Sequence, residues 1–394
     1  MNYKRIGDYI ELVDERNKEL KVTTLLGLSI SKQFIPSVAN TIGTNMKNYK
    51  IIRKNQFACS VMQVRRDGKM PVALLKDFDE AIISQAYPVF QVIDEEELLP
   101  DYLMMWFTRS EFDREATFHA VGGVRGSLEW EDFLDFELPI PSIEKQQQIV
   151  AEYNTVTNRI QLNEKINTNL EATAQALYKH WFVDFEFPYV TSSGVEMPYK
   201  SSGGKMVYNE ELDTDIPVGW SVERLGDISN LKYGKMLNSD LFLPEGYPVF
   251  SGYGIRGYYS EYMYKERQIL VLCRGVSGTG RVELSPPKSY ITNLSIIVQP
   301  DKSILKKLFL YFYLKNDNLR ELDSGSAQSQ ITTGDLGFRN ILTPSIVLQE
   351  HFDIKVNTIL NNISSAISQT KTLKELQSLL LAKMTQSHIK TELA

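Results

Sequence analysis

The sequence predicts an α+β protein in which two similar globular units alternate with two long helices. Three observations predict this fold class: an internal repeat, two long stretches of heptad periodicity, and short β-branched runs set among glycine and proline. The chain has 394 residues, of which 43% are hydrophobic and 23% charged. That length and composition fit a folded protein with more than one core and exclude a disordered chain.

The internal repeat is carried by three matches that occur in the same order in both copies. Residues 138–143 (Leu-Pro-Ile-Pro-Ser-Ile) match residues 341–346 (Ile-Leu-Thr-Pro-Ser-Ile), residues 5–8 match 224–227, and residues 98–107 match 304–313. Because the spacing between the matches drifts, we expect the copies to differ by internal deletions. The repeat predicts one fold used twice.

A heptad pattern follows each copy and predicts a long helix there. Apolar residues alternate at spacings of four and three from Ile149 to Trp181 and again from Phe352 to Met384. A sustained 3.5-residue repeat is typical of a coiled coil, although an apolar stripe can also be the core face of an ordinary helix. We expect the two helices to pair antiparallel, with residue numbers that sum to about 533. The predicted pairing residues are Ile149, Tyr153, Ile160, Leu170, Leu177, Trp181, Phe352, Ile359, Ile363, Leu373, Leu380 and Met384.

The globular units combine short strands with one short apolar helix each. Residues 87–93, 268–272 and 294–298 have the composition of strands, and residues 101–108 and 307–314 that of helices, which predicts a mixed sheet. Serine and glycine are frequent between the copies, so residues 188–216 are interpreted as a linker. The predicted segments are a first domain at 1–142, a long helix at 143–187, the linker at 188–216, a second domain at 217–345, a second long helix at 346–388 and a tail at 389–394.

The sequence offers little evidence for catalysis or metal binding. Its two cysteines and four histidines form no metal-binding motif, and it has no nucleophile elbow. The glycine pattern at residues 252–257 resembles a dinucleotide fingerprint, but a strand-like aromatic run follows it where a helix is required. We therefore expect no catalytic residue, no metal and no cofactor in this chain. The longest apolar run, at residues 308–314, is too short for a membrane span, so we expect a cytoplasmic protein without membrane contact.

Basic residues nevertheless cluster locally in a chain whose net charge is −6. Between Lys32 and Lys76 there are nine cations and a single acid, Asp67, and in the second unit cations alternate with tyrosines on a glycine-rich background. Cations and planar donors suit phosphate contacts and the reading of base edges, whereas the alternative is a solvated surface. The predicted DNA-binding residues are Lys47, Lys50, Arg65, Arg66, Lys69, Arg125, Tyr253, Arg256, Arg274, Arg281, Lys288, Gln328 and Gln330.

The sequence resembles the specificity subunit of Type I restriction-modification systems. Three blocks carry the resemblance: residues 181–188 (Trp-Phe-Val-Asp-Phe-Glu-Phe-Pro), residues 199–207 (Tyr-Lys-Ser-Ser-Gly-Gly-Lys-Met-Val) and residues 216–220 (Ile-Pro-Val-Gly-Trp). The Pro-Ser-Ile motifs that precede the helices, at residues 141–143 and 344–346, add to it. The resemblance extends over nearly the whole chain.

The resemblance implies a function in DNA recognition. It implies two target recognition domains that each read one half of a split double-stranded DNA sequence, held apart by two antiparallel helices. It also implies two modification subunits, which use S-adenosylmethionine to methylate adenine, and restriction subunits that cut unmodified DNA. Two alternatives stay open from the residues alone: a structural coiled-coil connector without DNA binding, and a self-sufficient DNA-modifying enzyme.

Overall fold

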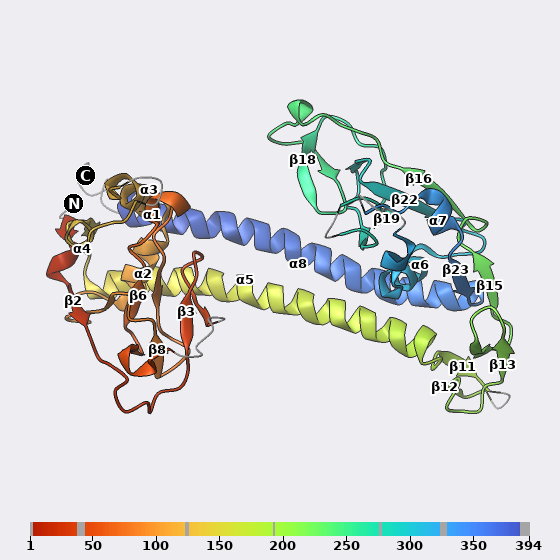
Figure 1. The fold of residues 1–394 in the computed structure, drawn as a ribbon, viewed down its shortest axis with the longest axis horizontal. Helices are drawn as coiled ribbons and strands as arrows, with labels where there is room; N and C mark the ends of the chain where they lie inside the picture. Colours follow the sequence, from red (N-terminus) through yellow and green to blue (C-terminus); the bar gives the residue numbers. More distant parts are fainter. Residues whose placement is uncertain are drawn as a thin grey trace. The chain divides into compact units, whose positions relative to one another are not determined.

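The computed structural model describes residues 3–37, 44–122, 126–191, 194–275, 278–323 and 329–386 (Figure 1). The chain forms two compact units: unit 1 comprises residues 1–164 and 368–394, and unit 2 comprises residues 165–367. Each unit therefore contains one β-rich domain and one half of each long helix. The structure confirms the predicted fold class.

Unit 1 is built on a four-stranded antiparallel sheet with the strand order β2-β9-β6-β7. These strands are β2 (Ile10–Val13), β9 (Val89–Val92), β6 (Phe57–Cys59) and β7 (Val72–Leu74). Three further antiparallel pairs are β1 (Tyr3–Arg5) with β10 (Glu137–Pro139), β3 (Leu26–Leu28) with β4 (Phe34–Pro36), and β5 (Lys50–Arg53) with β8 (Glu80–Ile83). The short helices are α1 (Val64–Asp67), α2 (Pro100–Thr108), α3 (Ser110–His119) and α4 (Trp130–Leu134), with 3₁₀ turns at Ile6–Asp8 and Met46–Asn48.

Unit 2 repeats this plan. Its four-stranded antiparallel sheet has the order β16-β22-β19-β20, with β16 (Ser229–Tyr233), β22 (Ser295–Pro300), β19 (Ile269–Leu272) and β20 (Val282–Leu284). A second sheet pairs β17 (Tyr247–Phe250) with β18 (Ile255–Tyr259) and, in parallel, with β21 (Tyr290–Ile291). The remaining domain elements are β15 (Ser221–Arg224) paired with β23 (Asn340–Thr343), the helices α6 (Lys307–Asn316) and α7 (Thr333–Gly337), and 3₁₀ turns at Ser239–Leu241 and Leu319–Leu322.

The two cores are made by the same elements in each unit. In unit 1 the ring of Phe57 stacks on Phe90 of the neighbouring strand at 4.9 Å, and Phe107 of α2 lies edge-on to Phe57 at 5.9 Å. In unit 2 the residues of β19 and β22 pack under α6. Cys59, at the end of β6, and Cys273, directly after β19, are both buried, and burial raises the pKa of each thiol. The cysteines are therefore core residues.

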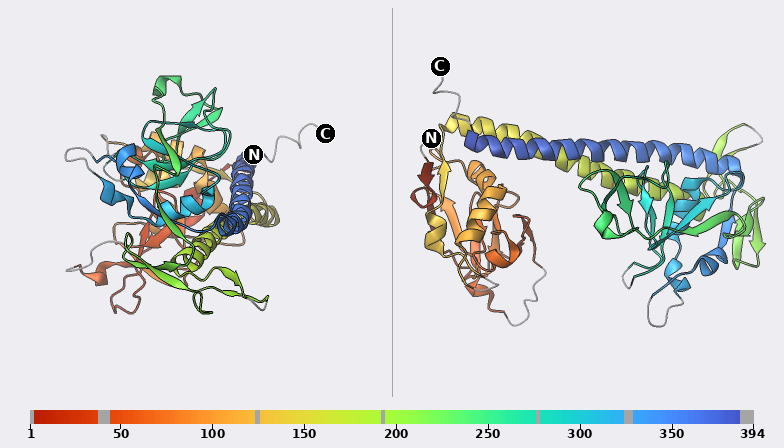
Figure 2. Two further views of the ribbon diagram at one scale, coloured as in Figure 1. Left: turned by 90° about the vertical axis from the view of Figure 1, so that its right-hand side faces the viewer. Right: turned by 90° about the horizontal axis from the view of Figure 1, so that it is seen from above.

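The long helices are α5 (Ile143–Tyr178), which continues through a π-turn at Lys179–Val183, and α8 (Ile346–Gln386). Within each unit one half of α5 packs antiparallel against one half of α8 (Figures 1 and 2). In unit 1 the Asn163 amide donates to the Thr370 hydroxyl at 3.4 Å, and in unit 2 the rings of Trp181 and Phe352 lie 6.0 Å apart. Both pairs have the residue-number sum that the sequence predicts. All twelve predicted pairing residues are buried or half-buried.

The segment interpreted as a linker has more structure than its composition indicated. It contains the hairpins β11 (Pro188–Val190) with β12 (Glu196–Pro198) and β13 (Met206–Asn209) with β14 (Thr214–Pro217). The ring of Phe187 stacks between Tyr199, at 4.5 Å, and Trp220, at 5.3 Å. This aromatic cluster ties the hairpins to the end of α5, because Trp220 also contacts Phe182.

Candidate nucleic-acid interface

Two loops occupy equivalent places in the two four-stranded sheets. Loop A (residues 60–71) joins β6 to β7 in unit 1, and loop B (residues 273–281) joins β19 to β20 in unit 2. Loop A carries Arg65, Arg66 and Lys69, whereas loop B carries Arg274 and Arg281, and all five side chains are exposed. The fold thus places five of the predicted DNA-binding residues in these two equivalent loops, three in loop A and two in loop B.

Loop A is flanked by the segment that precedes α4. The backbone N–H of Arg65 donates to the carbonyl of Gly126 at 3.2 Å, and the N–H of Leu128 donates to the carbonyl of Val61 at 2.9 Å. A Cβ at Gly126 would lie 3.1 Å from the Arg65 Cβ, so glycine permits this close approach. Arg125, which the sequence predicts as a DNA-binding residue, lies just before this segment and outside the described residues.

Loop B has an equivalent neighbour before α7. Arg274 and Gln330 form an antiparallel bridge, and the Ser329 hydroxyl donates to the Thr279 hydroxyl at 2.7 Å. The N–H of Ile331 donates to the Cys273 carbonyl at 3.0 Å. Gln330 therefore lies beside Arg274, and this is the arrangement that two residues need to contact adjacent DNA bases. Gln328, another predicted DNA-binding residue, lies outside the described residues.

Two of the loop cations are already paired with carboxylates of their own unit. Arg66 Nε donates to Asp67 Oδ1 at 2.6 Å, and Arg281 Nε donates to Glu283 Oε1 at 2.6 Å. The Arg66 guanidinium keeps the pKa of Asp67 below its usual value. Both pairs are exposed at the arginine side, and exposed ion pairs contribute little to stability. A DNA phosphate or guanine could therefore replace the carboxylate at small cost.

The other predicted DNA-binding residues lie outside the two loops. Lys47 is exposed in the turn at Met46–Asn48, Arg256 is exposed on β18, and Lys288 is exposed before β21. Lys50 is a poor candidate because its side chain is only 12% exposed and lies 3.8 Å from Asp14, and burial lowers its pKa. The sequence pattern does not reveal this burial, because Lys50 begins a strand among other basic residues.

Sequence reasoning also missed a buried ion pair that supports loop A. Lys32, counted as part of the basic surface, is 7% exposed, and its ammonium lies 2.8 Å from Asp113 of α3. Lys32 also donates to the Phe107 carbonyl, and Asp113 Oδ1 accepts the backbone N–H of Met70 at 3.2 Å. Burial lowers the pKa of Lys32, whereas Asp113 opposes this shift. Asp113 therefore fixes the end of loop A, a role that no periodicity in the sequence indicates.

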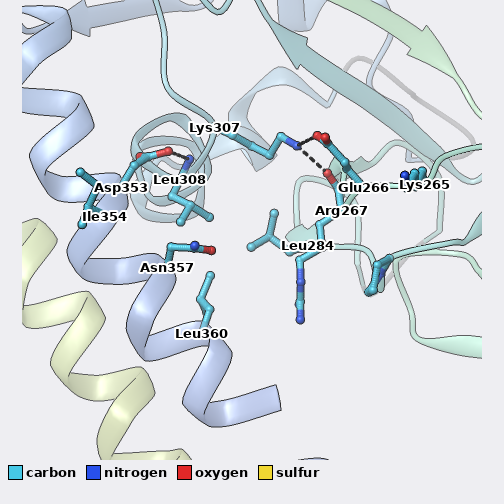
Figure 3. Close-up of a pocket in the computed structure, with 11 residues that line it drawn as sticks. Lys265, Glu266, Arg267, Leu284, Lys307, Leu308, Asp353, Ile354, Asn357 and Leu360 are labelled. Carbon is cyan, nitrogen blue, oxygen red and sulfur yellow. Dashed lines mark hydrogen bonds and ion pairs between the residues drawn. The ribbon is translucent and has the colours of Figure 1, made fainter. Parts of the chain in front are cut away.

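A cavity of about 560 Å³ lies beside α8 within unit 2 (Figure 3). Lys307, on its wall, lies 3.2 Å from Glu266, and Arg267 donates to the Ser364 hydroxyl at 2.7 Å. The Asp353 carboxylate accepts the backbone N–H groups of Leu308 and Phe309 at 3.2 and 2.9 Å, so a residue of α8 caps α6. Burial raises the pKa of Asp353. Two polar residues of the lining, Arg267 and Asp353, thus hold the domain onto α8.

The described residues contain no group of three or more histidine, cysteine, aspartate or glutamate side chains placed to bind a metal. Among the same residues, no helix is both long and apolar enough to span a bilayer. The residues brought together in the loops are arginine, lysine and glutamine, which suit recognition of nucleic-acid phosphates and base edges.

Comparisons with known proteins agree with this geometry. A family model described as "Type I restriction modification DNA specificity domain" matches residues 43–172 and 217–378, which include loop A and loop B respectively. The Type I restriction enzyme MjaIX specificity subunit of Methanocaldococcus jannaschii is 26% identical over 329 residues, which cover 76% of this chain and 72% of that protein. The Type I restriction enzyme HindI specificity subunit of Haemophilus influenzae is 23% identical over 411 residues, which cover 86% and 88%.

One solved structure shows the same fold over nearly the whole chain. The S subunit of a Type I restriction-modification system from M. genitalium superposes with a TM-score of 0.64 at 18% identity. The superposition covers 97% of this chain and 95% of that one. The likeness therefore includes both β-rich domains and both long helices.

Proposed function

Because the chain belongs to the family of Type I restriction-modification DNA specificity subunits, we propose that each of its two domains reads one half of a bipartite DNA target. The observation that carries this proposal is the equivalence of loops A and B. The two loops join equivalent strands of the two sheets, and both carry exposed arginines. Each loop is flanked by the segment that precedes a short helix, α4 in unit 1 and α7 in unit 2. Two equivalent reading surfaces on one chain suit a target with two separate halves.

The loops differ in chemistry, which supports two different half-sequences. Loop A presents two consecutive arginines and a lysine, whereas loop B presents Arg274 next to Gln330 on a glycine-rich backbone. In the major groove arginine donates two hydrogen bonds to guanine, whereas glutamine donates to N7 of adenine and accepts from its N6 amino group. Exposed lysines outside the loops, such as Lys47 and Lys288, suit phosphates instead. The recognised base pairs thus depend on loop residues, whereas the sheets are shared.

The chain carries out its function within a larger assembly. It directs two modification subunits to the target, and these subunits bind S-adenosylmethionine and methylate adenine. Restriction subunits join the same complex and cut DNA that lacks the methyl groups. Because the chain has a net charge of −6, the partner subunits supply part of the positive charge that holds the DNA phosphates.

A footprint of the assembled methyltransferase on DNA tests this proposal. We expect two protected patches separated by base pairs whose identity is free, and no methylation of DNA by the purified chain alone. A single continuous recognition sequence would contradict the two-domain proposal. Methylation by the isolated chain would show instead that it is an enzyme in its own right.

A further inference from the structure

Tyr253 lies against loop B, although the sequence pattern around it predicts a residue that contacts DNA. It follows β17 in a tight turn, and its side chain extends across the glycines of loop B. A Cβ built on Gly278 would lie 2.6 Å from the Tyr253 ring, and one on Gly275 would collide with the Tyr253 hydroxyl. The hydroxyl donates to the Arg274 carbonyl at 3.3 Å. The ring thus fills the space that both glycines leave.

The turn that carries Tyr253 is itself firmly held. The N–H of Ser251 donates to the Gly254 carbonyl at 3.2 Å, and the hydroxyl of Ser295, on β22, donates to the Ser251 carbonyl at 3.0 Å. Ser251 and Ser295 are both buried. Gly252 has a φ of +77°, and a Cβ there would meet the side chain of Leu272, so the turn packs directly on the end of β19. Contacts therefore run from the central sheet through Tyr253 to the backbone of Arg274.

We propose that Tyr253 is a positioning residue that fixes the backbone of loop B at Arg274, Gly275 and Gly278, and hence the direction of the Arg274 side chain, instead of reading a base itself. This inference rests on the proposed function in DNA recognition. An arginine can contact guanine bidentately only if its backbone is fixed, since a small displacement removes both hydrogen bonds. Tyr253 provides that fixation by filling the space above Gly275 and Gly278 and by donating to the Arg274 carbonyl.

The proposal predicts a specific pattern in a double-mutant cycle of Tyr253→Ala and Gly278→Ala. The three atoms nearest to a Cβ on Gly278 all belong to Tyr253, so alanine at this position acts first on the Tyr253 side chain. We expect each single variant to reduce discrimination in the half-site read by unit 2 by about tenfold, within the range for loss of one bidentate contact. The double variant should be no worse than Tyr253→Ala, because the ring that the new methyl group displaces is absent.

Two further variants separate positioning from base reading and from a general loss of folding. Tyr253→Phe keeps the ring and should retain most of the discrimination, since only the 3.3 Å hydrogen bond is lost. Tyr208→Ala removes an exposed tyrosine from β13 and is the matched control, which should leave both half-sites unchanged. In every variant of Tyr253 and Gly278 the sequence of the half-site read by unit 1 should stay as in the wild type.

The experiment maps methylated sequences in cells that express the modification subunits with each variant chain. If the effects of Tyr253→Ala and Gly278→Ala multiply, or if Gly278→Ala has no effect, Tyr253 does not position loop B. Loss of selectivity in Tyr253→Phe equal to that in Tyr253→Ala would show that the ring packed on Gly275 and Gly278 does not hold the loop, and it would also overturn the proposal. If the wild-type chain itself does not determine which sequences are methylated, the proposed function fails and not merely this inference.

Discussion

Gln146 and Gln349 make the same three hydrogen bonds in the two units. The amide of Gln146 accepts the N–H of Leu99 at 2.9 Å and donates to two carbonyls, those of Glu97 and Pro141. Gln349 accepts the N–H of Lys306 at 2.8 Å and likewise donates to two carbonyls. Both side chains are fully buried. Each glutamine therefore fixes the first turn of a long helix to the residues that start the short helix of its domain.

Replacing Gln349 with leucine should destabilise unit 2. The substitution keeps the side chain of similar size but leaves a backbone N–H and two carbonyls without their partner, and unsatisfied buried groups are costly. We expect the free energy of unfolding to fall by about 2 to 4 kcal/mol. Denaturant unfolding followed by fluorescence measures this change, because two of the four tryptophans, Trp181 and Trp220, lie in unit 2.

Two neighbouring glutamines of α5 provide the same test in unit 1 together with its matched control. Gln146→Leu should destabilise unit 1 by a similar amount, whereas Gln147→Leu changes an exposed residue on the next position of α5. Surface substitutions usually change stability by less than about 0.5 kcal/mol. Equal effects of the two variants would show that the hydrogen bonds of Gln146 do not hold the helix.

Asp353 predicts a pH dependence of stability in unit 2. Burial raises the pKa of its carboxyl above the usual value of 3.8, so the folded state favours the protonated form. The resulting contribution to stability is complete below pH 3.8 and is lost as the pH rises through the raised pKa. The side chain in Asp353→Asn cannot ionise. As the pH rises, the wild type should therefore lose stability relative to this variant. A difference that is constant with pH would contradict this assignment.

Arg274 and Arg66 should contribute to specificity at single base pairs. We expect Arg274→Ala and Arg66→Ala each to weaken specific binding by about 1 to 3 kcal/mol and to relax the requirement at one base pair. Asp67→Asn should have the opposite effect in unit 1, because Arg66 no longer has to leave its carboxylate partner. Binding measured on variant DNA at several salt concentrations checks this. A uniform loss on all sequences with a shallower salt dependence would make these residues phosphate contacts.

The long helices should set the number of unread base pairs between the half-sites. Four residues inserted after Asn163 and after Gln369 lie opposite each other in the observed register and lengthen the pair by about 6 Å at 1.5 Å per residue. The spacer should grow by one to two base pairs, since DNA rises about 3.4 Å per base pair. Methylation mapping gives the spacer directly. An active variant with an unchanged spacer would show that helix length does not determine it.

The local patterns of the sequence predicted the helices better than they predicted the surfaces. The heptads from Ile149 and Phe352 specify both the helices and their register, because coiled-coil pairing depends on a short repeat. The sheet order could not be predicted, since the contact of Phe57 with Phe90 joins residues far apart in the chain. Burial of Lys32 also depends on a distant partner, Asp113, so composition alone placed it wrongly on the basic surface.

The candidate site was predicted by residue type but not by role. Arginines in loops A and B stand out in the sequence because they are cations among glycines and strands. The role of Tyr253 depends on a turn that brings it over Gly275 and Gly278, and nothing local to residue 253 indicates that contact. The hairpins in residues 188–216 were likewise hidden by a serine- and glycine-rich composition, although Tyr199 packs on Phe187.

The central claim, that the two domains read their half-sites independently, is tested most directly by exchanging one domain and mapping the methylated sequences. Residues 1–140 would be replaced by the equivalent domain of a relative with a different target, in cells that supply the modification subunits. We expect one half of the methylated sequence to change and the other half to stay identical, with methylation at these sites absent when the chain is deleted. A change in both halves, or methylated sequences that do not depend on this chain, would contradict the account.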